Sequence, residues 1–429
     1  MRSVALDVHR SFCEIAIAEG GDVRHAGKIE TTPEQIELFA QSLASDDEVV
    51  LEATGGAMEI ASIIRPHVAR VVVANAAEVR AISHARVKSD RFDAATLARL
   101  LSADMLDEVW IPDETTRILR RRIARRAALV RQRTRTKNEV HAVVMRCLLG
   151  RPPASDLFGL KGRDWLQAQQ LPEEERETVD GCLGLIDFLT EQTAKLDQAI
   201  ARQSLSSPQV KRLMTIPGVD VTTAAALMAA IGEISRFDSP RKLVAYLGLD
   251  PKVRQSGDEQ ARHGHISKRG NAQARCVLVE AAWIAVRSPG PLRAFGQRVR
   301  SKRGSQIAAV AVARKLTVLC WHMLTKEEDY AFARASLVRK KMRKLERAAG
   351  AAKLATRHGG SRISASAGER EAEQQLARQS EHAYRRLIAD WKASGKEKGA
   401  SIPSGRASSS HLPEEETTAR QETAPDPAL

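Results

Sequence analysis

The sequence predicts an α/β domain followed by a largely α-helical region. Three observations predict this architecture. Strand-like and helix-like patterns alternate over the first hundred residues, the stretch from Asp113 to Leu149 contains no Gly or Pro, and helical patterns dominate from residue 206 onward. The chain has 429 residues, of which 43% are hydrophobic, so it can bury the cores of two or three domains.

The N-terminal elements follow one another at short intervals. In order, the patterns predict strands at 3–8, 12–18 and 22–29, a helix at 33–43, a strand at 48–53, a helix at 58–64 and a strand at 70–74. The first three strands and the tight turn at Gly20-Gly21 predict an antiparallel meander. A further helix begins at Asp90, and the resulting βββαβαβα order is that of a ribonuclease-H-like domain.

Two long helices are expected next. The stretch from Asp113 to Leu149 and a second one from Glu173 to Ser204 are predicted to pair as a helical hairpin or coiled coil, and Arg151-Pro152-Pro153 separates them. Acids are absent between Arg117 and Lys137, so pairs four residues apart cannot neutralise the first helix. A solvated charged helix is the alternative, but this one-sided charge favours a helix that contacts phosphates. The expected contacts are Arg121, Arg122, Arg125 and Arg126.

The rest of the chain reads as a compact α-rich domain and a tail. Ser239-Pro240 predicts a helix start, and Ser305 to Leu324 is apolar enough to be a central helix. After Tyr330 the chain is basic, and from about Ser394 it is rich in Ser, Pro, Glu and Thr, which predicts disorder. The expected segments are 1–110 (α/β domain), 111–205 (helical linker), 206–330 (α-rich domain) and 331–429 (basic helical extension and disordered tail).

Charge and composition indicate which kind of binding partner the protein has. A formal charge of +14 favours a polyanion, and nucleic acid is the leading candidate because each phosphate that is neutralised releases a counterion. No long uncharged apolar run or signal-peptide core predicts a membrane partner, so the expected location is cytoplasmic, at the bacterial nucleoid. The five cysteines are scattered without a CxxC pair, which predicts neither a zinc site nor a disulfide framework.

Four carboxylates lie at positions where a folded domain does not usually place a charged side chain. Asp7 lies inside the first apolar strand, where an unpartnered charge costs several kcal/mol. Glu52 closes another apolar strand, at the end where open α/β sheets place their chemistry. Asp90 and Asp93 lie three apart at a helix start and project from one face.

Each acid also has a purely structural interpretation. Asp7 can pair with a buried arginine, Glu52 can belong to a turn, and the other two can favour a helix N-terminus. Their combination on a ribonuclease-H-like order instead predicts a metal site for phosphodiester chemistry. Hard oxygen ligands suit Mg²⁺ or Mn²⁺.

Several short motifs carry a more specific resemblance. They are LDV at Asp7, LEATGG at Glu52, VKSDRFDA at Asp90 and Asp93, IPGV at 216–219, YLGLDP at 246–251, QSG at 255–257 and HISKRGN at 265–271. In order and spacing they resemble the insertion-sequence-110 family of transposases, which are DEDD recombinases related to pilin-gene invertases. The resemblance covers roughly residues 1–330.

The resemblance implies a divided active site. A RuvC-like N-terminal domain is joined in that family by a coiled coil to a C-terminal transposase domain that holds a catalytic serine. By motif match the acids are Asp7, Glu52, Asp90 and Asp93, and the serine is Ser256. From the residues alone, a Ser-Gly in a polar loop indicates only a turn. Metal activation of a serine hydroxyl is nonetheless established chemistry.

Two loops are candidate phosphate contacts. Lys268 and Arg269 lie on a glycine-flanked loop close in sequence to Ser256, which favours binding of DNA phosphates. The IPGV segment is similar to a helix-hairpin-helix turn, but Asp220 replaces the usual second glycine. An acid there repels phosphate, so a structural turn and a DNA contact are equally expected.

The leading hypothesis is therefore a transposase or site-specific recombinase that cuts and rejoins double-stranded donor and target DNA. The resemblance implies guidance by a structured bridge RNA and a homo-oligomer, either a dimer or a tetramer. One alternative is a RuvC-like, structure-specific nuclease that uses water as the nucleophile. The others are a site-specific DNA invertase and a non-catalytic nucleic-acid-binding protein.

Overall fold

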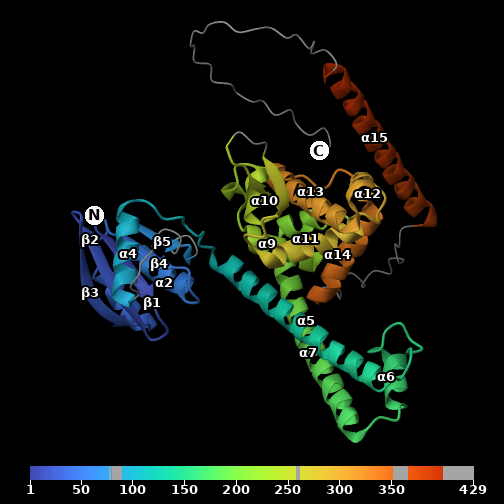
Figure 1. The fold of residues 1–429 in the computed structure, drawn as a ribbon, viewed down its shortest axis with the longest axis horizontal. Coiled ribbons are helices and arrows are strands. Elements are labelled where there is room, and N and C mark those ends of the chain that lie inside the picture. Colours follow the sequence, from blue (N-terminus) through green and yellow to red (C-terminus); the bar gives the residue numbers. More distant parts are fainter. Residues whose placement is uncertain (77–78, 80–88, 258–260, 351–365, 400–429) are drawn as a thin grey trace, which may run out of the picture. The chain divides into compact units, whose positions relative to one another are not determined.

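The computed structural model describes residues 1–76, 79, 89–257, 261–350 and 366–399. The chain divides into two compact units, Met1–Asp113 and Glu114–Leu429 (Figure 1). The first unit mixes strands and helices, and the second is largely helical, as the sequence predicts. The stretch 400–429, where disorder is expected, lies outside the described residues.

The first unit is built on a five-stranded sheet with the order β3-β2-β1-β4-β5. Its strands are β1 (Ser3–Val8), β2 (Phe12–Glu19), β3 (Asp22–Glu30), β4 (Glu48–Glu52) and β5 (Arg70–Ala74). The first three strands form the predicted antiparallel meander. Strand β4 then pairs in parallel with β1, and β5 in parallel with β4.

Helices cover both faces of this sheet. They are α1 (Pro33–Gln41), α2 (Ala57–Ile64) and α4 (Asp90–Ser102), with a 3-10 turn, η1, at Arg65–His67. Side chains alternate along a strand, so Leu6 packs in the core with α1 and α2, whereas Ala5 packs in the core with α4. Both faces are apolar because this sheet lies between two helical layers.

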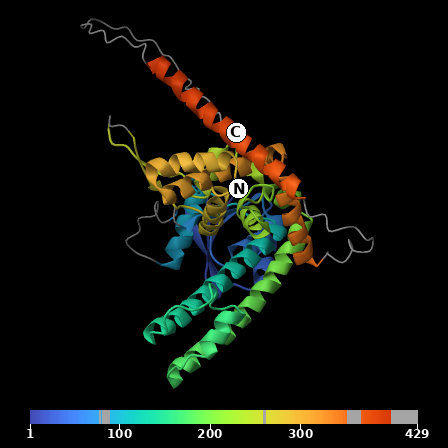
Figure 2. The same ribbon diagram turned by 90° about the vertical axis from the view of Figure 1, so that its right-hand side faces the viewer.

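Two 33-residue helices form an antiparallel hairpin in the second unit. They are α5 (Glu114–Arg146) and α7 (Glu173–Leu205), and both views show them side by side (Figures 1 and 2). The short helix α6 (Leu160–Gln167) lies at their far end, where its Leu166 joins a core with Val140 and Val179. The predicted pairing of the two long helices is thus observed.

A helical bundle follows the hairpin. Its elements are α8 (Pro208–Leu213), α9 (Val221–Ile231), η2 (Ile234–Arg236), α10 (Pro240–Tyr246), β6 (Pro251–Arg254), β7 (Arg262–Ile266), α11 (Ala272–Ala285), α12 (Pro291–Arg303) and α13 (Ser305–Lys326). Ser239 caps α10 as predicted, because its side chain accepts a hydrogen bond from the Lys242 amide. Helix α13 is long and apolar enough to cross a bilayer, but nine of its residues are buried in the protein core.

The basic extension contributes to the same bundle. Helix α14 (Ala335–Ala349) places Leu345 and Ala349 in the main core of the second unit. Helix α15 (Ala367–Gly399) is anchored to α12 by Glu381, which is 3% exposed and accepts a hydrogen bond of 2.8 Å from Arg293 Nε. Both helices therefore pack against residues that precede 330, and α14 is an integral part of the bundle.

Candidate active site and nucleic-acid contacts

Asp7 and Glu52 follow the last paired residues of two neighbouring parallel strands. The register of β1 and β4 ends with Leu6 opposite Leu51, and the two acids come next in each strand. Alternation turns both acids toward the α4 face, because Ala5 and the residue opposite it pack there. Both carboxylates thus lie at the carboxyl ends of central strands, where open α/β sheets place ligands.

Helix α4 brings two further acids to this sheet face. Ser89 caps the helix by accepting a hydrogen bond of 3.3 Å from the Phe92 amide, so Asp90 and Asp93 lie in the first turn. Leu97 then packs in the core against the sheet. An acid in the first turn also complements the helix dipole, but the dipole does not account for the proximity of both acids to Asp7.

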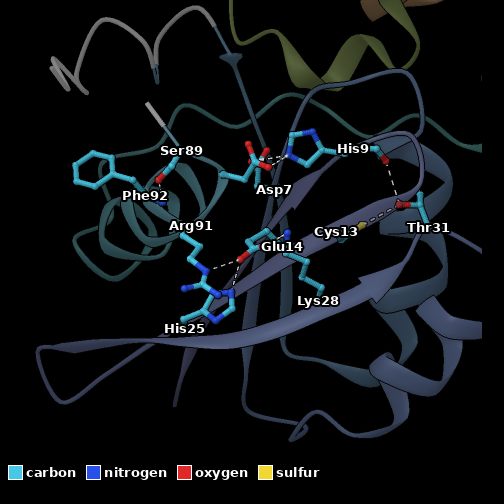
Figure 3. Close-up of polar contacts among 11 residues, drawn as sticks. Asp7, His9, Cys13, Glu14, His25, Lys28, Thr31, Ser89, Arg91 and Phe92 are labelled. Carbon is cyan, nitrogen blue, oxygen red and sulfur yellow. Dashed lines mark hydrogen bonds and ion pairs between the residues drawn. The ribbon is translucent and has the colours of Figure 1, made fainter. Parts of the chain in front are cut away.

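Asp7, His9 and Asp90 form one group of potential metal ligands, with one ligand atom of each lying within 4.8 Å of the others. His9 Nε2 lies 3.1 Å from Asp7 Oδ2 and 3.5 Å from Asp90 Oδ2. Figure 3 shows His9 turned toward Asp7. The sequence patterns did not single out His9, although its position two residues after Asp7, directly after β1, was a usable signal.

Burial and nearby negative charge raise the pKa of the Asp7 carboxyl. Burial raises the pKa of this carboxyl, His9 lowers it, and the charges of Asp93 and Asp90 raise it, with a net increase above the ordinary value. A cation is the natural partner for such a group, because it offsets both the burial and the repulsion. Asp93 therefore acts on Asp7 through its charge although it lies outside the three-residue group.

These residues fit a hard divalent cation. Carboxylate oxygens suit Mg²⁺ and Mn²⁺, and the added imidazole of His9 favours Mn²⁺ over Mg²⁺ among these two. Glu52 lies at the adjacent strand end but outside the group that the described residues form. The structure thus brings Asp7 and Asp90 together, with Asp93 near enough to shift the Asp7 pKa.

A second charged cluster lies beside this group and was not predicted. Glu14 on β2 is fully buried, opposite Asp7 in the strand register. Its carboxylate contacts His25, and it lies 3.1 Å from Lys28 Nζ and 3.5 Å from Arg91 Nε (Figure 3). Burial alone would raise the pKa of Glu14, but hydrogen bonds from Lys28 and His25 outweigh burial and lower it.

Arg91 connects the two clusters, because it stands between Asp90 and Asp93 in the first turn of α4. The contact with Glu14 therefore ties the acidic end of this helix to β2. An acid at position 14, inside the apolar run of the strand, was the available signal in the sequence.

Ser256 lies in the second unit, on the exposed loop that follows β6. The base of the β6–β7 hairpin joins two motifs that are distant in the sequence. Ser267 Oγ donates a hydrogen bond of 2.5 Å to Asp250 Oδ1, and the Lys268 amide donates one of 3.1 Å to the Gly248 carbonyl. YLGLDP and HISKRGN are thus neighbours that support the serine loop.

Two glycines permit this close approach. Gly248 and Gly270 have φ values of +67° and +107°, which disfavour a side chain. A Cβ on Gly248 would meet the Arg269 carbonyl oxygen at 2.1 Å, and one on Gly270 would meet the Tyr246 carbonyl oxygen at 2.0 Å. Lys268 itself has a φ of 56°. The loop conformation therefore depends on backbone contacts that only glycine permits.

Lys268 and Arg269 are exposed, and neither side chain has an ion pair within the described parts of the chain. Their charges remain available to an anion.

The IPGV turn at 216–219 has a structural explanation. Asp220 caps α9 by accepting a hydrogen bond of 2.9 Å from the Thr223 amide, and Lys341 Nζ donates hydrogen bonds to the carbonyls of Met214, Ile216 and Val219.

The four candidate arginines of α5 have different environments. Arg126 pairs with Asp197 of α7 at 2.5 Å, and Arg122 donates a hydrogen bond of 2.8 Å to Gln203 Oε1 of the same helix. Arg121 pairs with Glu114 at 2.9 Å. Arg125 is exposed and has no ion pair among the residues that the structure describes. Two arginines thus join the hairpin, Arg126 through an acid of α7 and Arg122 through an amide of the same helix.

Comparisons with known proteins match both units. The profile described as "Transposase IS116/IS110/IS902 family" matches residues 210–297, and a transposase profile, DEDD_Tnp_IS110, matches residues 4–148. The latter range contains the four acids, and the former contains Ser256.

Similar proteins come from several bacteria. Protein y4qE of Sinorhizobium fredii is 30% identical over 287 residues, which are 65% of this chain and 70% of that protein. The transposase for insertion sequence element IS1328 of Yersinia enterocolitica is 25% identical, covering 56% of this chain and 72% of its own length. The pilin gene-inverting protein of Moraxella bovis is 25% identical, with 66% and 81% covered. This chain belongs to the IS116/IS110/IS902 family of transposases.

Proposed function

We propose that the chain cuts and rejoins DNA by using a RuvC-like acidic site and Ser256. The observation that carries the proposal is the group formed by Asp7, His9 and Asp90 where β1 meets the start of α4. The element order around this group supports a ribonuclease-H-like fold. Membership of a transposase family supports DNA as the substrate.

The acids Asp7, Glu52, Asp90 and Asp93 would hold Mg²⁺ or Mn²⁺, with His9 as a further ligand. A bound ion of this kind lowers the pKa of an attacking hydroxyl and offsets negative charge on phosphate. The protein's own contribution is to hold these carboxylates together despite their repulsion. The buried β1 strand would hold Asp7 in this way, the capped start of α4 would hold Asp90 and Asp93, and the end of β4 would hold Glu52.

In the proposed reaction, Ser256 Oγ attacks a DNA phosphorus atom. A bond forms between Oγ and phosphorus, and the bond from phosphorus to a sugar oxygen breaks. The serine loses its hydroxyl proton and the leaving sugar oxygen gains one. A hydroxyl of another strand then attacks the phosphoserine ester and regenerates the serine, so no nucleotide cofactor is consumed. The exposure of Ser256 supports this role, and the free charges of Lys268 and Arg269 would attract the phosphate.

The proposed partners follow from charge and family. Double-stranded donor and target DNA are the substrates, and a structured bridge RNA is the proposed guide. The net charge of +14 supports binding of both polyanions. We further propose a homo-oligomer, a dimer or tetramer, that acts in the cytoplasm at the nucleoid.

The test uses the full chain, Mg²⁺ and a plasmid that carries the gene with its flanking DNA. The wild-type protein should form a covalent protein–DNA adduct that survives denaturing electrophoresis, and it should exchange strands. Ser256→Ala should abolish both, whereas Ser301→Ala, at an exposed serine of α12, should change neither. Cutting without an adduct by Ser256→Ala would refute the serine nucleophile. Unchanged activity of Asp7→Ala would refute the metal site.

Two other functions have specific support. The group around Asp7 belongs entirely to the first unit, which favours a RuvC-like nuclease that uses water if Ser256→Ala still cuts. The similarity to pilin gene-inverting proteins favours site-specific inversion. Inversion of a segment between two flanking sites, without insertion elsewhere, would identify that function in the same assay.

A further inference from the structure

We propose that a basic groove between α14 and α15 binds the phosphate backbone of duplex DNA, outside both segments that match the family profiles. The groove has a volume of about 580 Å³ and is formed by the two helices that follow residue 330. The profile matches end at residue 297, so they assign nothing to it. We call this feature the α14–α15 groove.

The charge of the α14–α15 groove is strongly one-sided. Seven arginine and lysine side chains line it against a single carboxylate among the residues that the structure describes. That carboxylate, Glu373, already accepts a hydrogen bond of 2.8 Å from the Ser336 amide and contacts the Ser336 hydroxyl. It therefore holds α15 against α14 rather than neutralising the groove.

Three of the cations are fully available. Lys340, Lys344 and Arg347 are exposed, and the described structure records no ion pair for any of them. Their spacing places them on one face of α14. Like charges four residues apart on a helix destabilise it. A polyanion that binds there relieves this repulsion.

A solvated charged face is the plain alternative for any basic helix. Two features distinguish the α14–α15 groove from it. Arg370 of α15 lines the groove opposite the cations of α14, so the charges face a concavity and not open solvent. Arg334 Nε is buried without a hydrogen-bond partner within the described residues, and it belongs to the same lining.

The position of α15 is set by contacts within the bundle. Glu381 is buried beneath Arg293 of α12 and Arg385 of its own helix, with contacts of 2.7 and 2.6 Å. Glu369 also lies 3.8 Å from Arg339 of α14. The two walls of the groove are therefore attached to one another and to α12.

A duplex fits the lining better than a single strand does. Proteins that bind single strands combine charge with aromatic side chains on which bases stack. No aromatic side chain lines the described groove. At about 1.5 Å of rise per residue, Lys340 and Arg347 are roughly 10 Å apart along the helix, or about three base-pair steps of 3.4 Å. The choice of DNA over RNA rests on the proposed function.

The experiment measures binding of the full chain to a fluorescent 30-base-pair DNA duplex in buffer without divalent metal. Anisotropy is followed as salt is varied. The variant Lys340→Gln/Lys344→Gln/Arg347→Gln should lower the salt slope by about 2–3, at about 0.9 per lost phosphate contact. Binding should also weaken by about tenfold or more at low salt. Because no cutting is measured, a failed serine or metal mechanism leaves this result interpretable.

The matched control removes three exposed cations of α12 and α15 that lie outside the lining, Lys302, Arg378 and Arg386. It should change the slope much less. An equal loss in the control would overturn the proposal, because net charge alone would then explain it. A loss confined to an RNA duplex of the same sequence, or no loss at all, would also overturn it. Unchanged circular dichroism excludes misfolding of either variant.

Discussion

Asp7 and Glu14 face one another across β1 and β2, yet their carboxyl pKa values move in opposite directions. Burial and two nearby acids raise the pKa of Asp7, whereas hydrogen bonds from Lys28 and His25 overcome burial and lower that of Glu14. The positive charge near Asp7 is thus too small to offset its burial and the nearby acids, whereas Lys28 and His25 stabilise the Glu14 carboxylate. This difference separates a candidate ligand from a structural ion cluster.

Glu14→Gln should destabilise the protein by about 1–3 kcal/mol, because partners are left without their anion, although partial exposure of Lys28 reduces the loss. The low folded pKa means that the stabilisation is present above the unfolded value of 4.5 and is lost as pH falls through the folded value. Urea unfolding across this pH range would measure it. Glu30→Gln, at an exposed acid of β3, should change stability by less than about 0.5 kcal/mol.

Asp7→Asn should make the metal-free protein more stable at neutral pH. A raised folded pKa means that the folded state binds more protons than the unfolded state above the reference value of 3.8, so stability falls as pH rises through the folded pKa. The amide removes this cost. The same variant should lose recombination by more than about a hundredfold, since even supporting residues of metal sites cost 10–100-fold.

Metal addition tests whether Asp7 is a metal ligand, as the expected loss of recombination assumes. Mn²⁺ at a hundred times its Kd should stabilise the wild-type protein by about 2.7 kcal/mol in thermal unfolding. Asp7→Asn should show little of this gain. An equal gain in both proteins would place the ion elsewhere and contradict the assignment.

Lys341→Met should destabilise the second unit by about 1–3 kcal/mol, because three backbone carbonyls lose their donor. Burial lowers the pKa of the Lys341 ammonium from 10.5 to about 8. The unfolded chain therefore binds more protons between these values, and stability should rise with pH across that window. The variant should lose this rise. Lys340→Met, at the exposed neighbouring position, should retain it.

Gly248→Ala should destabilise the protein by about 2–4 kcal/mol, through a left-handed backbone that disfavours alanine and a clash with the Arg269 carbonyl. The β6–β7 hairpin, whose loop carries Ser256, should then be cut faster by a protease in limited proteolysis. Gly264→Ala is the control, since its added methyl meets Lys252 atoms only at 3.6 Å or more. Equal protease sensitivity of the two variants would argue against a tight hairpin base.

Substitutions of Arg125 and Arg126 should have different effects, one on DNA binding and the other on stability. Arg126→Gln removes the contact with Asp197 and should lower stability by about 0.5–1 kcal/mol, a small value because the pair is partly exposed. Arg125→Gln should leave thermal stability unchanged and weaken DNA binding, with a salt slope smaller by about one. If Arg126→Gln had the larger effect on the salt slope, the phosphate-contacting arginine would be the paired one.

Local patterns predicted most of the elements. The strand Ser3–Val8 has the predicted bounds, and the helix Glu173–Leu205 differs from its prediction by one residue. Alternation, capping and glycine turns act within a few residues, so they can be read directly. Helix α5 ends at Arg146, three residues before the predicted end, because nothing in the local pattern marks where a helix frays.

The sequence by itself determined that Asp7 lies within a buried strand, that Glu52 ends another and that Asp90 begins a helix. Only the tertiary structure decided that His9 joins Asp7 and Asp90, that Glu14 holds Arg91, and that Arg126 pairs with another helix. The physical reason is that contacts between distant residues depend on strand register and helix packing, which no single segment encodes.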